Sequence, residues 1–269
     1  MTTEPTNNQP FVESFDAARS GLPGAGLGWL KAARESGIER FEALGLPTPK
    51  LEAWKYTRLR PLEDTRYQPV TDEDGMAVLD TVPSLLPDPG GRPRLVFVNG
   101  RMRPNFWIDG DLPDGVHLEC LRDVLETRPD WIRERLGAVA GEEASSLVQL
   151  NTAMMDTGFM LHVEEGVRVE TPIEVIFVGG LTARPVAYSP RNLIVLGKGA
   201  EATVIKYHAG LGVGAYFANS VTEIDVGPGA QLRNYKVQAE AKEATHISTV
   251  RVRVARDATY ESFSLSIGG

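Results

Sequence analysis

The sequence predicts a mainly β protein, with a β-solenoid in its second half and a mixed, mostly helical first half. Three observations lead to this fold class. Valine, isoleucine and alternating patterns dominate after Asn151, glycines punctuate that half at regular distances, and an internal repeat recurs every 28 to 33 residues. One coil cannot bury its apolar face alone, so stacked coils are expected to supply the core.

Composition narrows the class of protein further. With 269 residues, 42% of them apolar and 24% charged, the chain can form one large globular domain or two modest ones. The net charge of −8 argues against nucleic acid as a partner, because such a partner requires a basic face. The polar start lacks the apolar region of a signal peptide, and no run approaches the ~18 apolar residues of a membrane helix. We therefore expect a soluble, cytoplasmic protein with no membrane partner.

The chain is expected to begin with a helical region. Residues 1–10 predict a disordered arm, and apolar side chains in residues 11–45 recur at helical spacings. Gly45 and Pro47 follow in the order that typically ends a helix. This part of the sequence therefore predicts a helix that stops at Gly45.

Shorter elements complete the expected N-terminal domain, residues 1–150. Residues 61–93 are rich in proline, aspartate and glycine and predict loops with short structured pieces. Residues 94–99 predict a strand, and residues 118–136 predict a second helix. Residues 137–150 are expected to be helical or connecting, so the domain is mixed and mostly helical.

The repeat is clearest when it is anchored on Ala200, Ala230 and Ala258. Residues aligned on these alanines fall into columns that alternate at period two, which places one column inside and the next in solvent. The columns before the anchors are Ile194, Ile224 and Val252; Val195, Asp225 and Arg253; and Leu196, Val226 and Val254. Those after the anchors are Ile205, Tyr235 and Phe263; Lys206, Lys236 and Ser264; Tyr207, Val237 and Leu265; and His208, Gln238 and Ser266. A plain antiparallel sandwich remains the alternative to stacked coils.

Several segments resemble the SufB/SufD family of iron–sulfur cluster assembly scaffolds, in the family's own order. The first is Gly-Leu-Pro-Thr-Pro-Lys-Leu-Glu-Ala-Trp-Lys-Tyr-Thr at residues 45–57, followed by Arg-Leu-Arg-Pro-Leu at 58–62. The others are Leu-Asn-Thr-Ala at 150–153, Pro-Arg-Asn-Leu-Ile-Val-Leu at 190–196, Tyr-Phe at 216–217, Val-Thr-Glu-Ile at 221–224 and Ser-Leu-Ser-Ile-Gly-Gly at 264–269. The similarity covers most of residues 40–269.

The resemblance implies a right-handed parallel β-helix over residues 151–269, incomplete relative to the family, after a mostly helical domain. It also implies a non-enzymatic scaffold whose partners are SufB and the ATPase SufC. An iron–sulfur cluster is then expected only transiently in the complex, and no cofactor in this chain. Family members continue past the Ser-Ile-Gly-Gly passage, so the SufC-docking segment is expected to be absent here. Uncapped strands leave a homodimer as an open expectation.

Residues that could carry chemistry show no active pattern. The histidines His117, His162, His208 and His246 share no column of the repeat, and no pair has the spacing of a metal motif. Cys120 has no second cysteine nearby and is expected to be a small buried residue. We therefore predict no catalytic, cofactor-binding or metal-binding residue in this chain.

Two glycine-rich passages and one pair of acids have structural explanations. Residues 210–215 do not complete a dinucleotide-binding GxGxxG, and residues 197–199 lack the Ser or Thr of a phosphate loop, so both predict corners. Glu223 and Asp225 lie on one outward face, opposite two arginines of the next coil, Arg251 and Arg253. They are therefore expected to form solvated ion pairs.

Trp54, Lys55 and Tyr56 are the segment most suited to a partner. An aromatic anchor for the N-terminal helices is the favoured interpretation, and a contact surface is the alternative. For the whole chain we predict an assembly scaffold. A carbohydrate-active β-helix enzyme, which needs paired acids in a cleft, and a self-associating structural module remain as alternatives.

Overall fold

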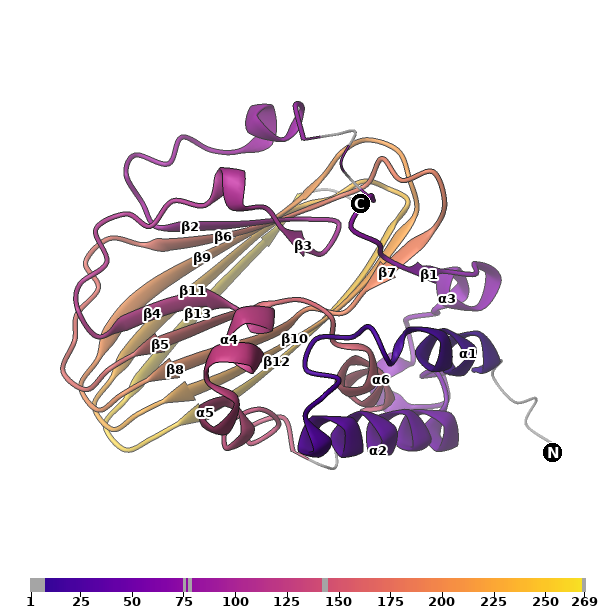
Figure 1. Cartoon of the computed structure of the whole chain (residues 1–269), viewed down its shortest axis with the longest axis horizontal. Coiled ribbons are helices and arrows are strands. Elements are labelled where there is room, and N and C mark those ends of the chain that lie inside the picture. Colours follow the sequence, from indigo (N-terminus) through magenta and orange to yellow (C-terminus); the bar gives the residue numbers. More distant parts are fainter. Residues whose placement is uncertain (1–7, 75, 77–78, 142–144, 268–269) are drawn as a thin grey trace.

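Successive coils of a parallel β-helix form the C-terminal half of the computed structural model, which describes residues 8–74, 76, 79–141 and 145–267. The chain passes back and forth between two sheets, and each strand pairs in parallel with the strand one coil away. The first sheet contains β8 (Arg191–Leu196), β10 (Tyr216–Val226) and β12 (Ala244–Val254). The second sheet contains β9 (Glu201–Gly210), β11 (Gln231–Ala239) and β13 (Thr259–Ser266). Parallel pairing confirms the predicted solenoid over an antiparallel sandwich (Figure 1).

Strands from earlier in the chain extend both sheets. The remaining strands are β1 (Gln68–Pro69), β2 (Arg94–Val98), β3 (Arg101–Met102), β4 (Val116–Cys120), β5 (Phe159–Val163), β6 (Ile173–Gly179) and β7 (Val186–Tyr188). The predicted strand near residue 94 is confirmed as β2, which runs parallel to β6. By contrast, β4 lies antiparallel to β5. The first half of the chain therefore contributes strands to the β-helix as well as helices.

The strand pairing reproduces the columns of the repeat. Lys236 pairs with Lys206 on one side and with Ser264 on the other, and the neighbouring columns follow the same register. At the corners, Gly199, Gly229 and Asp257 take the same place in successive coils, with φ of 67°, 68° and 59°. Glycine adopts this left-handed conformation freely, and aspartate tolerates it better than most residues. The residues predicted as corners therefore form corners.

The polar columns of the second sheet, rather than the apolar ones, face the space between the two sheets, here called the lumen. In β9, Ala202 and Val204 point into the core between the sheets, so Lys206 and His208 point the same way at period two. The apolar column beside them points outward, and its last member, Phe263, is 56% exposed. Hydropathy alone therefore does not decide which column of a coil is internal.

Helices cover the outer face of the first sheet. They are α1 (Gln9–Ala18), α2 (Gly28–Leu44), α3 (Arg60–Asp64), α4 (Leu121–Thr127), α5 (Pro129–Arg133) and α6 (Ser146–Met154), with short 3-10 turns at Glu52–Trp54, Val82–Leu85 and Pro104–Phe106. α6 packs on β10, and α2 packs on α6, as Figure 1 shows. No helix within the described ranges is both long and apolar enough to cross a membrane.

Two of the expected helices differ from the structure. The chain within residues 11–45 forms two helices, because the segment after α1 turns at Gly24, whose φ is 68°. The segment 118–136 becomes helical only at Leu121, because the residues before it pair with β5. The predicted stop at Gly45 is confirmed. The expected N-terminal arm falls mostly on residues 1–7, which lie outside the described residues, and α1 already begins at Gln9.

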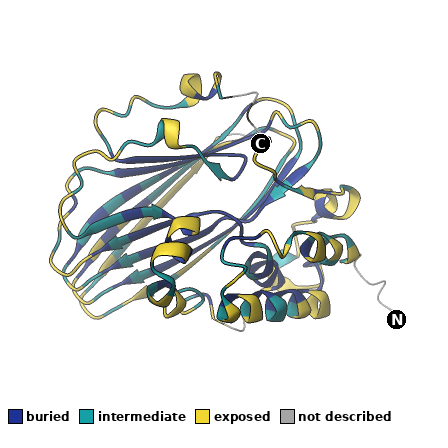
Figure 2. Cartoon of the chain, in the orientation of Figure 1, coloured by how far each residue is buried: buried dark blue, intermediate teal, exposed yellow. Residues whose placement is uncertain are grey.

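Three apolar layers account for the core. The first lies between the sheets and includes Ile194, Leu196, Ile224 and Val226, as the repeat predicted. The second joins the helices to the first sheet, and the third covers the outer face of β2 and β6. Because both faces of these strands are covered, the expectation that every second column meets solvent is wrong for the early coils (Figure 2).

Candidate functional site

A polar cavity of about 160 Å³ lies in the lumen of the β-helix. Its walls come from the six strands β8 to β13 and include two lysines, one histidine and several hydroxyl and amide groups, among them Lys206, His208, Ser220, Thr222, Asn234 and Lys236. This polar part of the lumen differs from the rest of the space between the two sheets, which is filled by apolar side chains such as Phe159, Ile194 and Val204. The cavity is therefore the strongest candidate for binding among the described residues.

Lys206 is the most unusual of the residues that line this cavity. It is 4% exposed, and no described carboxylate pairs with it. Burial, reinforced by the nearby charge of Lys236, lowers the pKa of Lys206 from 10.5 to about 8. Burial also lowers the pKa of Lys236, whose Nζ donates a hydrogen bond of 3.3 Å to Gln238. One buried and one half-buried ammonium group therefore face one polar space.

Glu240 lies at the corner between β11 and β12 and collects three polar partners. Tyr216 donates its hydroxyl at 2.8 Å and Gln238 its amide at 2.7 Å, while His246 Nδ1 shares a hydrogen bond of 2.6 Å. Burial alone would raise the pKa of Glu240, but the contacts with His246, Tyr216 and Gln238 outweigh it and lower that pKa. Glu240 is therefore held as a carboxylate.

The four histidines lie in two pairs, although the sequence separates them. The rings of His208 and His246 lie 4.6 Å apart, and those of His117 and His162 stack at 5.5 Å. His208 and His246 come from different sheets and meet at a corner of the β-helix. His117 and His162 lie opposite each other on the neighbouring strands β4 and β5. Burial, with the nearby His246 and lysines, lowers the pKa of His208 well below its usual range, so its ring is neutral at pH 7.

Glu223 has a structural role that differs from the predicted solvated pair. Its side chain is fully buried, and Arg191 of the previous coil donates to it at 2.7 and 2.9 Å. The backbone N–H groups of Gly137, Val139 and Ala140 add three further hydrogen bonds. The expectation of solvent around Glu223 is wrong because the segment before α6 covers it. Asp225, by contrast, forms the predicted exposed pair with Arg253.

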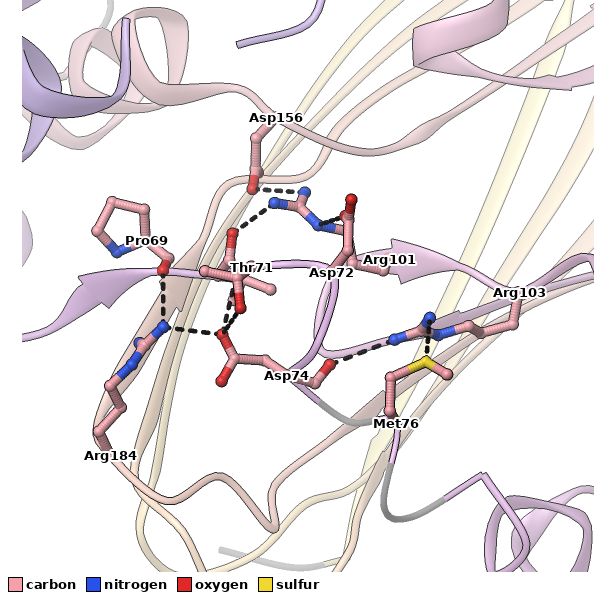
Figure 3. A network of polar contacts seen from close by, with 10 residues as sticks. Pro69, Thr71, Asp72, Asp74, Met76, Arg101, Arg103, Asp156 and Arg184 are labelled. Carbon is pink, nitrogen blue, oxygen red and sulfur yellow. Dashed lines mark hydrogen bonds and ion pairs between the residues drawn. The ribbon is translucent and has the colours of Figure 1, made fainter. Parts of the chain in front are cut away.

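A second polar network ties the segment before β2 to the β-helix (Figure 3). Arg101 pairs with Asp72 and with Asp156, and Arg184 pairs with Asp74 at 2.9 Å. Burial raises the pKa of Asp156, and the charge of Arg101 partly offsets this effect. Sequence reasoning missed this network, because its partners are distant in sequence: Arg184 and Asp74 lie 110 residues apart.

Cys120 and the aromatic signature lie where their residue types suggest. Cys120 is buried, and burial together with a hydrogen bond to Asp123 raises the pKa of its thiol to about 12. It is therefore a protonated packing residue at neutral pH. Trp54 packs against the core that joins the helices to the first sheet, whereas Tyr56 is 91% exposed beside Lys55.

The glycine-rich passages form corners, as predicted. Within residues 210–215, Gly212 and Gly214 have φ of 74° and 115°. A Cβ at Gly197 would lie 2.6 Å from the backbone nitrogen of Glu165 in the coil before it. Only glycine lets two coils approach this closely, so both passages serve the backbone of the β-helix.

Two family models together match nearly the whole chain. The SufBD protein N-terminal region matches residues 5–175, and the SufBD core domain, described as SUF system FeS cluster assembly, matches residues 180–269. Each model covers a part of the fold described above, first the helices with the early strands and then the regular coils. The chain therefore belongs to the SufBD family.

Within this family the chain is SufD-like. It is 28% identical to SufD of Escherichia coli over 86% of this chain and 52% of that protein. It is 24% identical to a SufBD family protein of Synechocystis, over 87% of this chain and 53% of the relative. The match to SufB of Bacillus subtilis, 27% identical, covers 57% of this chain and 33% of that protein. The chain spans about half the length of the SufD-like relatives it matches.

Proposed function

We propose that this chain acts as a scaffold component of iron–sulfur cluster assembly, in the cytoplasm and without catalytic turnover. The family match over both parts of the chain carries the proposal. The geometry supports it, since parallel coils present an extended surface and Glu223, the acid best placed for catalysis on this surface, is buried in a structural pair with Arg191. SufB-type and SufC-type subunits are the proposed partners, and the cluster is their shared cargo.

The alternative of a carbohydrate-active enzyme loses its residues in the structure. Glu223 is fully buried and accepts hydrogen bonds from Arg191 and three backbone N–H groups, so it cannot reach a glycosidic bond. Asp225 then has no second acid on its strand with which to share the chemistry. The proposal of a scaffold does not need either carboxylate.

Self-association is a second candidate with an observation of its own. Two outward columns of the repeat end in Phe263 and Leu265, whose exposed fractions are 56% and 40%. Exposed apolar side chains on a strand favour pairing with a second surface. Light scattering over a range of concentrations would show a rising mass if these residues join two copies. A constant monomer mass would exclude the homodimer.

Co-purification tests the proposed partnership. The tagged chain is co-expressed with SufB-type and SufC-type subunits, and capture of the tag is expected to retain the SufB-type subunit at high ionic strength. A matched capture with an unrelated β-helix protein serves as the control. Recovery of the chain alone, although it is folded by circular dichroism, would contradict the proposed partnership.

Tyr56 offers a finer test of the proposed partnership, at the exposed end of the segment Trp54, Lys55 and Tyr56. Its ring is 91% exposed, so Tyr56→Ala is expected to leave thermal stability unchanged. If the segment contacts a partner, the same change weakens capture, because tyrosines often carry much of an interface's binding energy. Leu44→Ala, at another exposed position of the N-terminal region, is the matched control. Equal capture by both variants would assign Tyr56 no role in binding.

A further inference from the structure

Three side chains of types that commonly bind transition metals converge at one corner of the lumen. His208 comes from β9, Glu240 from the turn after β11, and His246 from β12. One donor atom from each lies within 4.8 Å of the other two. His208 is 8% exposed, and the side chains of Glu240 and His246 are 5% and 3% exposed. We propose that this cluster binds one divalent transition-metal ion.

The donor set fits such an ion in type and in distance. Two imidazoles and one carboxylate are ligands of zinc and of ferrous iron, and they leave a position open for water. Metal–ligand bonds of about 2.1 Å in a tetrahedral site hold donors about 3.4 Å apart. Donors already within 4.8 Å reach that separation through small side-chain rotations, without movement of the coils.

An unsatisfied atom in the cluster is the independent observation. His246 shares its Nδ1 hydrogen bond with Glu240, but its Nε2 is buried and has no partner among the described residues. A buried imidazole nitrogen without a partner costs free energy, because it has lost its hydrogen bonds to water. A bound metal ion, directly or through its water ligand, gives the ring the partner that the protein does not provide.

The surroundings of Glu240 resemble the support that metal-binding carboxylates usually have. Tyr216 and Gln238 both donate to Glu240 and fix its orientation toward the histidines. Such outer contacts hold a ligand in place and tune its affinity. The second histidine pair differs, since its neighbouring carboxylate, Glu164, is 55% exposed and forms an ion pair with His117, at 3.0 Å.

The two lysines of the lumen oppose a cation and so set the strength of the site. Lys206 lies two residues before His208 on the same inward face, and Lys236 lies close enough to Glu240 for their charges to interact. Their positive charges weaken cation binding in a space where solvent screens little. The site is therefore expected to bind tightly only when its three ligands act together, and more tightly when a lysine is removed.

Cobalt titration of the chain alone tests this proposal, and its outcome does not depend on the proposed scaffold role. The metal-free chain is titrated with CoCl2, and d–d absorbance with one equivalent bound is expected. His246→Gln and Glu240→Gln are expected to lose that signal, whereas His117→Gln, in the other histidine pair, retains it. Circular dichroism verifies that each variant is folded. Absence of saturable binding to the wild type, or equal binding by His246→Gln, would overturn the proposal.

Two further variants test the support of the site without removing a ligand. Tyr216→Phe keeps the ring but loses the hydroxyl that holds Glu240, so cobalt affinity is expected to fall roughly 10- to 100-fold. Lys206→Met is expected to raise the affinity, because it removes a positive charge. Opposite shifts in these two variants support the site, and unchanged affinity in both would assign the bound cobalt to another place on the chain.

Discussion

Arg191 and Lys206 are both buried cations of the β-helix, yet their surroundings differ in kind. Arg191, on the outer face of the first sheet, is 2% exposed and donates two hydrogen bonds to Oε1 of Glu223, beneath the segment before α6. Lys206, inside the lumen, is 4% exposed and has no described carboxylate as a partner. The fold supplies a counter-charge for Arg191, whereas a counter-charge for Lys206 would have to come from a ligand in the cavity.

This contrast separates structural charges from functional candidates. A buried charge with a complete set of hydrogen bonds holds two parts of a protein in register, here the segment before α6 and the first sheet. A buried charge without them costs free energy and persists where it serves binding. By this criterion the buried charges on the outer face of the first sheet are structural, and the lumen is the candidate ligand-binding region.

The largest expected effect comes from breaking the outer pair. Glu223→Gln leaves Arg191 buried without a counter-charge, and we expect a loss of about 3–5 kcal/mol in the free energy of unfolding. Urea denaturation measures this loss. The double variant Arg191→Met with Glu223→Met is the control and is expected to recover part of the stability. A loss below about 1 kcal/mol would show that this buried pair contributes no more to stability than an exposed ion pair does, and would contradict the proposed difference between Arg191 and Lys206.

The lumen is expected to show a smaller, pH-dependent effect. The pKa of Lys206 falls from 10.5 to about 8 on folding, which corresponds to at most about 3 kcal/mol of destabilisation. The unfolded chain binds this proton more tightly, so the cost is complete below pH 8 and disappears as the pH rises to 10.5. Without metal, Lys206→Met is therefore expected to be more stable than the wild type below pH 8, and the two converge above it.

Chemical denaturation in the presence of a chelator measures that difference at each pH. Lys198→Met is the matched control, because the Lys198 side chain is 69% exposed at a corner. A constant difference between Lys206→Met and the wild type from pH 7 to pH 10 would mean that Lys206 already has a partner in the lumen.

The smallest expected effect belongs to Asp225, two residues after Glu223 on the same strand. Its partner Arg253 is 58% exposed, so Asp225→Asn is expected to cost less than about 1 kcal/mol, and less still at high salt. Thermal unfolding at two salt concentrations measures it. A cost close to that of Glu223→Gln would show that cover by the segment before α6 does not decide the strength of these pairs.

Much of the β-helix was readable from the sequence because its repeat is local. Gly199, Gly229 and Asp257 mark corners by their spacing, and the columns between them predicted the strand register correctly. The direction of the columns was not readable. Lys206 faces inward and Phe263 outward because backbone pairing sets the register of every strand, whatever the hydropathy of its side chains.

The candidate metal cluster shows why the sites were harder to predict than the fold. His208 and His246 lie 38 residues apart, in different columns of the repeat and on different sheets. A comparison of columns places them apart, yet the corner between β11 and β12 brings their rings to 4.6 Å. His208 lies in a polar column, so the hydropathy of the repeat gave no sign that its side chain faces the lumen beside His246.

The sequence by itself determined the stacked coils, their corners and the family, since periodic residues encode periodic backbone structure. Only the tertiary structure decided which faces are covered, and therefore which charges are paired. The segment before α6 that buries Glu223 and the corner that joins Glu240 to two histidines both depend on contacts between distant residues. Such contacts follow from packing in three dimensions, which no local pattern in the chain records.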